Sequence, residues 1–225
     1  LLLSGCLWGY SLLGQKKNGF DLSQATVPVE QILAGGPPRD GIPSINDPGF
    51  YAVEQAGRFL AGGARVLGLA FNGHSKAYPI AILNYHEVVN DHFGDIPVVI
   101  TYCPLCGSGV AFLAEVEGKV RTFGVSGLLY NSDVLLYDRE TESLWSQLRM
   151  EAISGPAAGT KLRPLSLQRT SWAGWQAQHP STLVLSPETG HNRNYQGNPY
   201  PLYEELDQLF FPVNHQDSRL PPKTW

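Results

Sequence analysis

The feature that most constrains the fold is a series of short apolar stretches separated by tight turns. The clearest case is Arg65–Phe71, followed by Asn72-Gly73 and a second apolar stretch over residues 75–80. Asn-Gly is a strong hairpin signal, because both residues accept the positive φ angles of a two-residue turn. Since few helical segments come between such stretches, the pattern predicts a mainly β (α+β) fold with antiparallel sheets. Further strands are expected over residues 96–102, 110–114, 120–125, 131–137, 144–148 and Leu183–Leu185.

Three short helices are expected beside these strands, over residues 49–60, 81–93 and 171–178. The second of them carries several polar side chains. His86 and Asn90 are four positions apart and would share one face of this helix, as would Glu87 and Asp91.

The N-terminal segment predicts a lipid anchor. Leu2-Leu3-Ser4-Gly5-Cys6 resembles the lipobox of bacterial lipoprotein signal peptides, in which small residues precede the modified cysteine. Residues 1–5 are then a remnant of the signal peptide, and Cys6 carries the lipid. The alternatives are the end of an uncleaved membrane helix and a buried structural cysteine. Either membrane-bound reading places the globular part outside the cytoplasm, in the periplasm or on the cell surface.

The chain length and charge limit the remaining possibilities. The 225 residues allow one large domain or two small ones. We predict a tether over residues 6–35 and a single globular domain over residues 36–225. The net charge of -4 offers no basic surface, which argues against a nucleic-acid partner. A small-molecule ligand remains open.

The turn Thr101-Tyr102-Cys103-Pro104-Leu105-Cys106-Gly107 is the strongest chemical motif. An apolar strand delivers two thiols, three positions apart, on a Pro/Gly turn. Similar turns occur in rubredoxin and zinc-ribbon sites, but there the turn occurs twice and supplies four thiolates. This chain has one copy, so the turn supplies only half of such a site. The alternatives are dithiol redox chemistry, a structural disulfide and buried free thiols.

His86 is the best candidate for a third ligand beside Cys103 and Cys106, because it precedes the strand that leads to the turn. Two thiolates and an imidazole suit a transition metal, either zinc or copper. Glu87 and Asp91 are candidates to orient the imidazole or to act as acid/base groups. The alternatives are a histidine that packs in the helix and bonds a backbone carbonyl, and a solvated acidic face. Asn90 equally suits a role in holding the neighbouring loop.

A second polar cluster lies in the segment from Ser126 to Asp133, between two predicted strands. Its hydroxyls, amide and carboxylate are the groups that a polar pocket needs. The same residue types also stabilise tight loops through bonds to their own backbone. The candidate pocket residues are Ser126, Tyr130, Asn131 and Asp133.

Five blocks together resemble the signature of a bacterial and archaeal family, domain of unknown function 3179. They are residues 76–79, 85–91, 101–107, 123–133 and 143–147, and they follow in the family's order. The resemblance covers about residues 36–225 and implies an extracytoplasmic protein without an assigned activity. It also implies that the chain is truncated at its C-terminus. No mechanism can be transferred from the family.

Three hypotheses for the function follow from the residues. The first is a membrane-anchored protein that binds zinc or copper through Cys103, Cys106 and His86. The second is a thiol–disulfide protein that uses the cysteine pair alone. The third is a binding module without catalysis. Whether the chain is an enzyme stays open.

Overall fold

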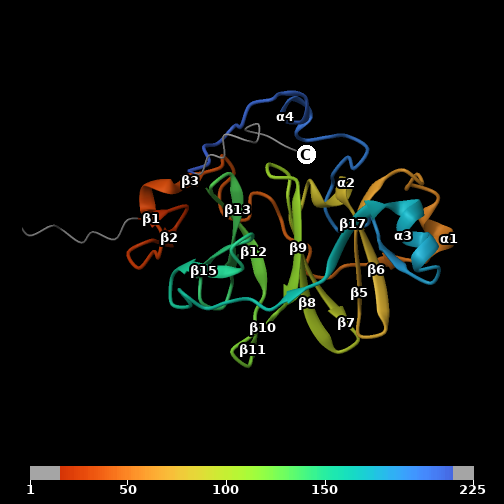
Figure 1. Ribbon diagram of the computed structural model, residues 1–225, viewed down its shortest axis with the longest axis horizontal. Coiled ribbons are helices and arrows are strands. Elements are labelled where there is room, and N and C mark those ends of the chain that lie inside the picture. The colour runs from red at the N-terminus through yellow and green to blue at the C-terminus, as the bar shows by residue number, and fades with distance from the viewer. Residues whose placement is uncertain (1–15, 215–225) are drawn as a thin grey trace, which may run out of the picture.

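The computed structural model describes residues 16–214, and Figure 1 shows their arrangement. Cys6 and the lipobox lie outside the described residues. Within residues 16–214, no helix is both long enough and apolar enough to cross a membrane. The described chain is mainly β, which confirms the predicted fold class.

Three sheets follow one another along the long axis of the molecule (Figure 1). Sheet I has the order β15-β14-β13-β12-β3, sheet II the order β16-β9-β8-β7, and sheet III the order β17-β5-β6-β18-β4. The neighbouring strands are antiparallel except β6 and β18, which are parallel. Two small hairpins, β1–β2 and β10–β11, complete the strands of the described chain.

Sheet I consists of β15 (Glu151–Ser154), β14 (Leu144–Ser146), β13 (Asp133–Asp138), β12 (Phe123–Tyr130) and β3 (Ile32–Ala34). Sheet II consists of β16 (Pro164–Leu165), β9 (Ser108–Leu113), β8 (Ile96–Cys103) and β7 (Val88–Phe93). Sheet III consists of β17 (Leu167–Ser171), β5 (Arg65–Phe71), β6 (His74–Pro79), β18 (Leu183–Leu185) and β4 (Phe50–Tyr51). The small hairpins are β1 (Lys16–Lys17) with β2 (Phe20–Asp21), and β10 (Glu115–Val116) with β11 (Lys119–Val120).

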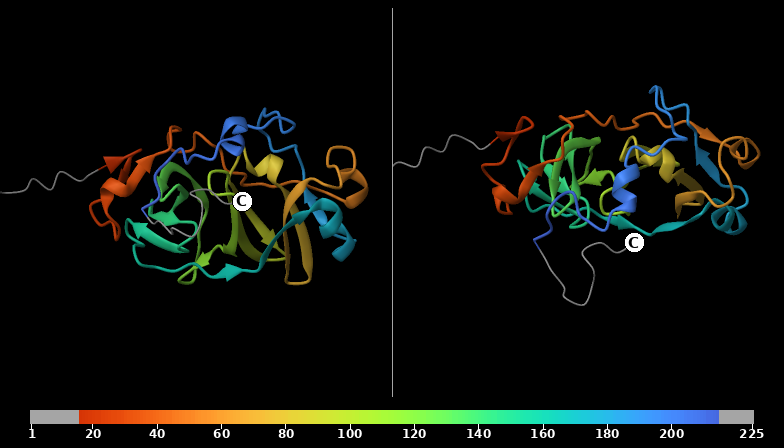
Figure 2. Two further views of the ribbon diagram at one scale, coloured as in Figure 1. Left: turned by 45° about the horizontal axis from the view of Figure 1, so that its top comes forward. Right: turned by 90° about the horizontal axis from the view of Figure 1, so that it is seen from above.

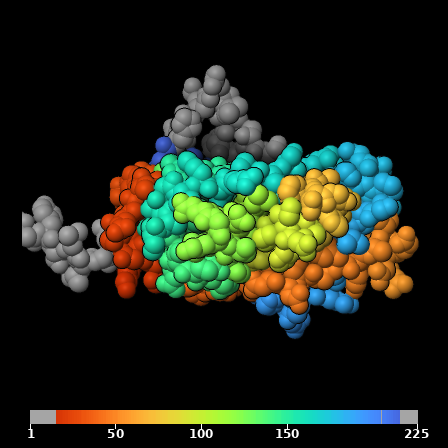
Figure 3. Space-filling model, turned by 90° about the horizontal axis from the view of Figure 1, so that it is seen from below, coloured from red at the N-terminus to blue at the C-terminus, as the bar shows by residue number. Residues whose placement is uncertain are grey.

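The helices are short and lie at the margins of the sheets. They are the 3-10 helix η1 (Val29–Gln31) and the α-helices α1 (Val53–Ala56), α2 (Ile80–Leu83), α3 (Trp172–Gln178) and α4 (Pro201–Glu205). Figure 2 shows α1 and α3 at the end of the molecule formed by sheet III, whereas α4 lies near its middle. Figure 3 shows the side opposite α4, where segments from the middle of the chain form most of the surface.

Sheet II lies between the other two sheets because both of its faces are apolar. On β8, Val98, Ile100 and Tyr102 pack with residues of sheet III such as Leu67. The alternate residues Val99 and Cys103 pack instead with sheet I. Side chains on a strand point alternately to opposite faces, so an apolar run on β8 is expected to be buried on both sides. The same alternation places Cys103 between sheets I and II.

Several of the predicted elements occur in the structure. The hairpin around Asn72-Gly73 is formed by β5 and β6, and Asn72 and Gly73 both have positive φ angles. The predicted third helix corresponds to α3, whose Ser171 side chain accepts a hydrogen bond from the backbone of Gly174.

Other local predictions were wrong. Residues 81–93 form α2, a turn and then β7, because the chain reverses at Glu87, whose φ angle is +59°. The helix expected over residues 49–60 is reduced to α1, and β4 precedes it. Part of the stretch predicted as a tether is folded, since β3 pairs with β12 and Ile32 is fully buried. Phe20 and Leu22 also pack there on the outer face of sheet I.

Candidate metal centre

The cysteine turn connects β8 to β9 and is held at both ends. Cys103 pairs with Ser108 across the hairpin, which leaves residues 104–107 as the loop. Gly107 has a φ angle of +61°, a conformation that glycine adopts without strain. The local pattern of a strand, a proline and a glycine thus produces the compact turn that the sequence predicted.

Two distant elements fix the turn from outside. Arg169 on β17 donates a hydrogen bond from Nη1 to the carbonyl of Gly107 at 3.0 Å. Tyr203 on α4 donates from its hydroxyl to the carbonyl of Leu105 at 2.8 Å. These bonds satisfy loop carbonyls, so the position of the two sulfurs depends on sheet III and on α4.

Asp133 reaches the cysteines from sheet I. It is the first residue of β13 and follows a two-residue turn in which Asn131 and Ser132 both have positive φ angles. Its Oδ1 lies 3.5 Å from Cys106 Sγ, and its Oδ2 accepts a hydrogen bond from the backbone of Leu148 at 3.1 Å. The bond to Leu148 orients the carboxyl group toward the turn.

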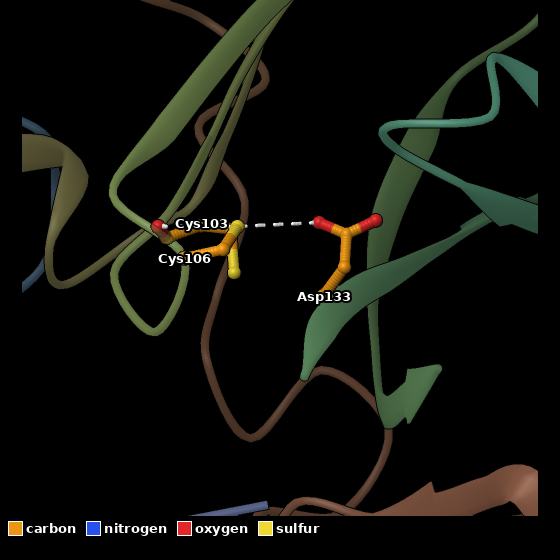
Figure 4. Close-up of side chains that lie close together, drawn as sticks. All are labelled: Cys103, Cys106 and Asp133. Carbon is orange, nitrogen blue, oxygen red and sulfur yellow. Dashed lines mark hydrogen bonds between the residues drawn. The ribbon is translucent and has the colours of Figure 1, made fainter. Parts of the chain in front are cut away.

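Cys103, Cys106 and Asp133 therefore form one compact group (Figure 4). The two sulfurs and a carboxylate oxygen all lie within 4.8 Å of one another. Cys103 and Asp133 are buried, Cys106 is partly exposed, and both thiols are free. Thiolates and carboxylates are ligands that proteins use for transition metals, so this group could hold a metal ion.

The protonation states of the three groups differ. A hydrogen bond with the Cys103 side chain, supported by bonds from Ser108, lowers the pKa of Cys106 to about 6, although burial opposes this. Burial raises the pKa of Cys103 well above its ordinary value. Burial, followed by the negative charge of Cys106, raises the pKa of Asp133 well above the usual range. The surroundings thus favour the thiolate at Cys106 and the protonated forms of Cys103 and Asp133.

A chain of polar side chains continues from Cys106 into the core. Ser108 Oγ lies 2.8 Å from Cys106 Sγ and donates to Gln147 Oε1 at 2.9 Å. Gln147 Nε2 in turn donates to Thr101 Oγ1 at 2.9 Å. Ser108, Thr101 and Gln147 were not among the predicted site residues. Only the alternation on β8 could have indicated Thr101, which points to the same face as Cys103.

His86 is not part of the group, which corrects the predicted ligand set. Its Nδ1 lies 2.8 Å from the carbonyl oxygen of Pro43, and its Nε2 lies 2.6 Å from the hydroxyl of Tyr195. Burial lowers the pKa of His86 to about 4, so the neutral ring donates from Nδ1 and accepts at Nε2. This is the packing role considered as the alternative. The physical reason is the reversal of the chain at Glu87. It directs the side chain of His86 toward Pro43 and Tyr195 and the side chain of Glu87 toward Tyr200.

Glu87 and Asn90 face sheet I. Glu87 is buried, and its Oε1 accepts a hydrogen bond from the hydroxyl of Tyr200 at 3.3 Å. Burial raises the pKa of Glu87 to about 8. Asn90 exchanges two hydrogen bonds with the backbone of Phe123, from Nδ2 at 2.8 Å and to Oδ1 at 2.9 Å, and so joins β7 to β12.

Asp91 lies on the other side of sheet II. Its carboxylate accepts hydrogen bonds from Lys76 Nζ at 2.8 and 2.9 Å and from the hydroxyl of Tyr78 at 2.6 Å. Asp91 therefore belongs to a buried ion pair between sheets II and III.

Of the predicted pocket segment, only Asp133 joins the group within the described chain. Ser126 donates to the carbonyl of Leu135 and accepts from the backbone of Leu128, at an irregularity in β12. Tyr130 packs on the outer face of sheet I, and Asn131 forms part of the turn before β13. The segment expected as a loop is thus mostly strand.

A family model described as "Protein of unknown function (DUF3179)" matches residues 39–225. The match covers more than half of the chain, so the chain belongs to this family, as the resemblance predicted. The matched range includes Glu87, both cysteines of the turn and Asp133. No curated protein and no solved structure matches the chain.

Proposed function

We propose that the chain binds one zinc ion through Cys103 Sγ, Cys106 Sγ and a carboxylate oxygen of Asp133. One observation carries the proposal. In a tetrahedral site with Zn–S of about 2.3 Å and Zn–O of about 2.0 Å, a sulfur and an oxygen ligand lie about 3.5 Å apart. The distance between Cys106 Sγ and Asp133 Oδ1 is 3.5 Å, so these two ligand atoms already have the separation that a zinc ion requires.

The donor set favours zinc over copper. Zinc accepts thiolate and carboxylate ligands together, whereas Cu(I) prefers thiolates and thioethers. The only methionine of the chain, Met150, is not in the group, and neither is a histidine of the described residues. Three protein ligands leave a fourth position for water or another molecule, which is typical of zinc sites that bind or transform a ligand.

The burial of the group is compatible with metal binding. Among residues 16–214, no cationic side chain forms an ion pair with Asp133. A divalent ion would supply the positive charge that this group of acidic ligands lacks, and binding would release the protons of Cys103 and Asp133. Buried charges in proteins are normally paired or coordinated in this way.

Zinc titration of reduced, metal-free protein tests the proposal. A Cys6→Ser background leaves only the two thiols of the turn. We expect one zinc per chain, measured by competition with a chromophoric chelator, and cobalt substitution should produce a thiolate-to-metal absorption band. Cys106→Ser and Asp133→Asn should weaken binding at least tenfold, whereas His86→Gln should not. Equal affinity in the wild type and in Asp133→Asn would contradict the ligand set.

A dithiol function is the second candidate, and the pKa of Cys106 favours it. A thiol with a pKa of about 6 is largely thiolate at neutral pH and can attack a disulfide, and Cys103 can then resolve the mixed disulfide. The reduction of a model disulfide by metal-free protein distinguishes the candidates. Reduction of one disulfide per chain, with oxidation of Cys103 and Cys106 to a disulfide, that is lost in Cys103→Ser and is unaffected by Asp133→Asn would favour the dithiol.

We further propose that Cys6 carries a lipid that anchors the protein outside the cytoplasm. The lipobox-like sequence before Cys6 supports this proposal. Metabolic labelling with a fatty acid in the bacterial host should mark the protein encoded by the full gene, and Cys6→Ser should abolish the label. The same label in both proteins would rule out lipidation at this position.

A further inference from the structure

A cavity of about 270 Å³ lies between sheet I, the cysteine turn and the C-terminal segment that includes α4. Its lining is apolar except for two side chains, Glu87 and Tyr200. The apolar side chains come from segments far apart in the chain, which include Ile42, Leu105, Val125, Leu129, Val134 and Phe210. An apolar cavity with very few polar groups is the usual form of a small-molecule site.

Glu87 provides the polar end of the cavity. Glu87 is 6% exposed, and its backbone has a positive φ angle of 59°, which a glutamate rarely adopts. Within the described chain, the one hydrogen bond to its carboxyl group comes from Tyr200, on Oε1. No cationic side chain of residues 16–214 pairs with it. A buried carboxyl group with a free oxygen therefore lines an apolar space.

The surroundings favour the uncharged form of this carboxyl group. Burial raises the pKa of Glu87 to about 8, and the negative charge of Cys106 adds to the shift. A carboxylic acid that stays neutral in an apolar site can donate a hydrogen bond to a carbonyl oxygen. A negatively charged ligand would be repelled by Cys106, so an anionic head group fits poorly.

We propose that this cavity binds a neutral, mainly apolar small molecule whose carbonyl oxygen accepts a hydrogen bond from Glu87. The apolar part of the ligand would contact Ile42, Leu129 and Phe210. Benzene fits a cavity of roughly 150 Å³, so the present cavity suits a ligand of about ten non-hydrogen atoms. The inference goes beyond the zinc site, since neither the two cysteines nor Asp133 lines the cavity.

Binding of 2-octanone to metal-free protein tests the proposal, with octylammonium and octanoate as charged probes of the same chain length. We expect saturable binding of the ketone with a Kd below about 1 mM, measured by calorimetry and saturation-transfer NMR. Both charged probes should bind at least tenfold more weakly. Because no metal is present, the outcome does not depend on the zinc proposal.

Variants locate the binding site. Glu87→Leu should weaken ketone binding roughly fivefold. Glu87→Gln should bind the ketone nearly as well as the wild type, because the amide keeps a hydrogen-bond donor. Leu129→Trp should fill the cavity and abolish binding. Phe210 is 50% exposed, so Phe210→Ala should fold normally and weaken binding by removing one wall. Leu148→Ala is the matched control, since Leu148 is 55% exposed and does not line the cavity.

Three results would overturn the proposal. The first is no saturable binding of 2-octanone by the folded wild-type protein. The second is tighter binding of octylammonium than of the ketone, which would indicate an ionised Glu87 and a cationic ligand. The third is unchanged ketone binding in Phe210→Ala together with unchanged binding in folded Leu129→Trp.

Discussion

The hydroxyl oxygen of Ser108 lies 2.8 Å from the sulfur of Cys106 and 2.9 Å from Gln147 Oε1, so its single proton can point to only one of these two acceptors at a time. The hydroxyl of Ser108 therefore stabilises the Cys106 thiolate only when its proton points away from Gln147, whereas the backbone of Ser108 lowers the pKa of Cys106 independently. This competition ties the reactivity of a partly exposed thiol to a fully buried amide. It also shows which residue to change in order to alter the pKa of Cys106.

Ser108→Ala should raise the pKa of Cys106. A hydrogen bond to a charged group contributes about 1.5–3 kcal/mol, which corresponds to roughly one to two pKa units. The rate of alkylation by iodoacetamide, followed by peptide mass spectrometry against pH in metal-free protein, measures this shift. Ser181→Ala, at an exposed position, is the control. Faster alkylation of Cys103 than of Cys106 in the wild type would contradict the assignment of the thiolate.

Zinc should stabilise the protein, and its affinity should fall with decreasing pH. At a free zinc concentration of 100 times Kd, the free energy of unfolding should rise by about 2.7 kcal/mol. Raised pKa values of Cys103 and Asp133 mean that binding displaces up to two protons, so the affinity should drop by up to roughly a hundredfold per pH unit below neutrality. Thermal unfolding and chelator competition at several pH values measure both effects. An affinity that does not change with pH would be inconsistent with these protonated ligands.

His86 should make the fold less stable in mild acid. Its pKa is about 4 in the folded protein and 6.5 in the ordinary state, so the unfolded chain binds the extra proton between these values. The free energy of unfolding should therefore decrease by up to about 3 kcal/mol as the pH falls from 6.5 to 4.

Urea unfolding at several pH values compares the wild type with His86→Gln, which should lose this part of the pH dependence. His74→Gln changes an exposed histidine and should keep it. Glu87 acts in the opposite direction, because its raised pKa adds stability that is lost as the pH rises toward 8. The test is therefore the difference between each variant and the wild type in how the free energy of unfolding changes with pH. The slope of the wild type alone combines both groups. Equal slopes in all three proteins would refute the role of His86.

Lys76→Met should destabilise the protein strongly. This substitution removes the cationic partner of Asp91, which is 5% exposed and lies between sheets II and III. Removing one member of a buried ion pair typically costs about 3–5 kcal/mol. The double variant Lys76→Met/Asp91→Leu should recover most of this loss, as measured by urea unfolding. A single variant as stable as the wild type would indicate that solvent reaches Asp91.

Gly127→Ala should destabilise the wall of the cavity. Gly127 has a φ angle of +72°, and a Cβ atom there would lie 2.2 Å from the carbonyl oxygen of Pro37. Gly118 has a similar φ angle of +74° but open space around it, so Gly118→Ala measures the backbone strain alone. Strain of this kind costs about 1 kcal/mol or more, and the clash should add to it only at Gly127. Equal losses in the two variants, measured by urea unfolding, would show that the contact with Pro37 relaxes freely.

Local sequence patterns correctly predicted much of the fold. The strand predicted over residues 96–102 and the Asn72-Gly73 turn depend on neighbouring residues, so they could be identified without the structure. The cysteine turn follows from the same local signals, and Cys103 and Cys106 were identified before any contact was known. The prediction of a helix over residues 81–93 was wrong. The spacing of apolar residues that suggested it also fits α2 followed by β7, a strand buried on both faces.

The partner of the thiols was decided only by the tertiary structure. His86 was the predicted third ligand, whereas Asp133 was assigned only to a separate polar pocket. The reversal at Glu87 directs His86 to Pro43 and Tyr195, while the packing of sheet I on sheet II brings Asp133 to Cys106. Most of the strands, the Asn72-Gly73 turn and the two sulfurs of the cysteine turn followed from the sequence alone, because they depend on local propensity, whereas β3 and β7 did not. Which carboxyl group meets those sulfurs depends on how two sheets pack, and no local pattern specifies that packing.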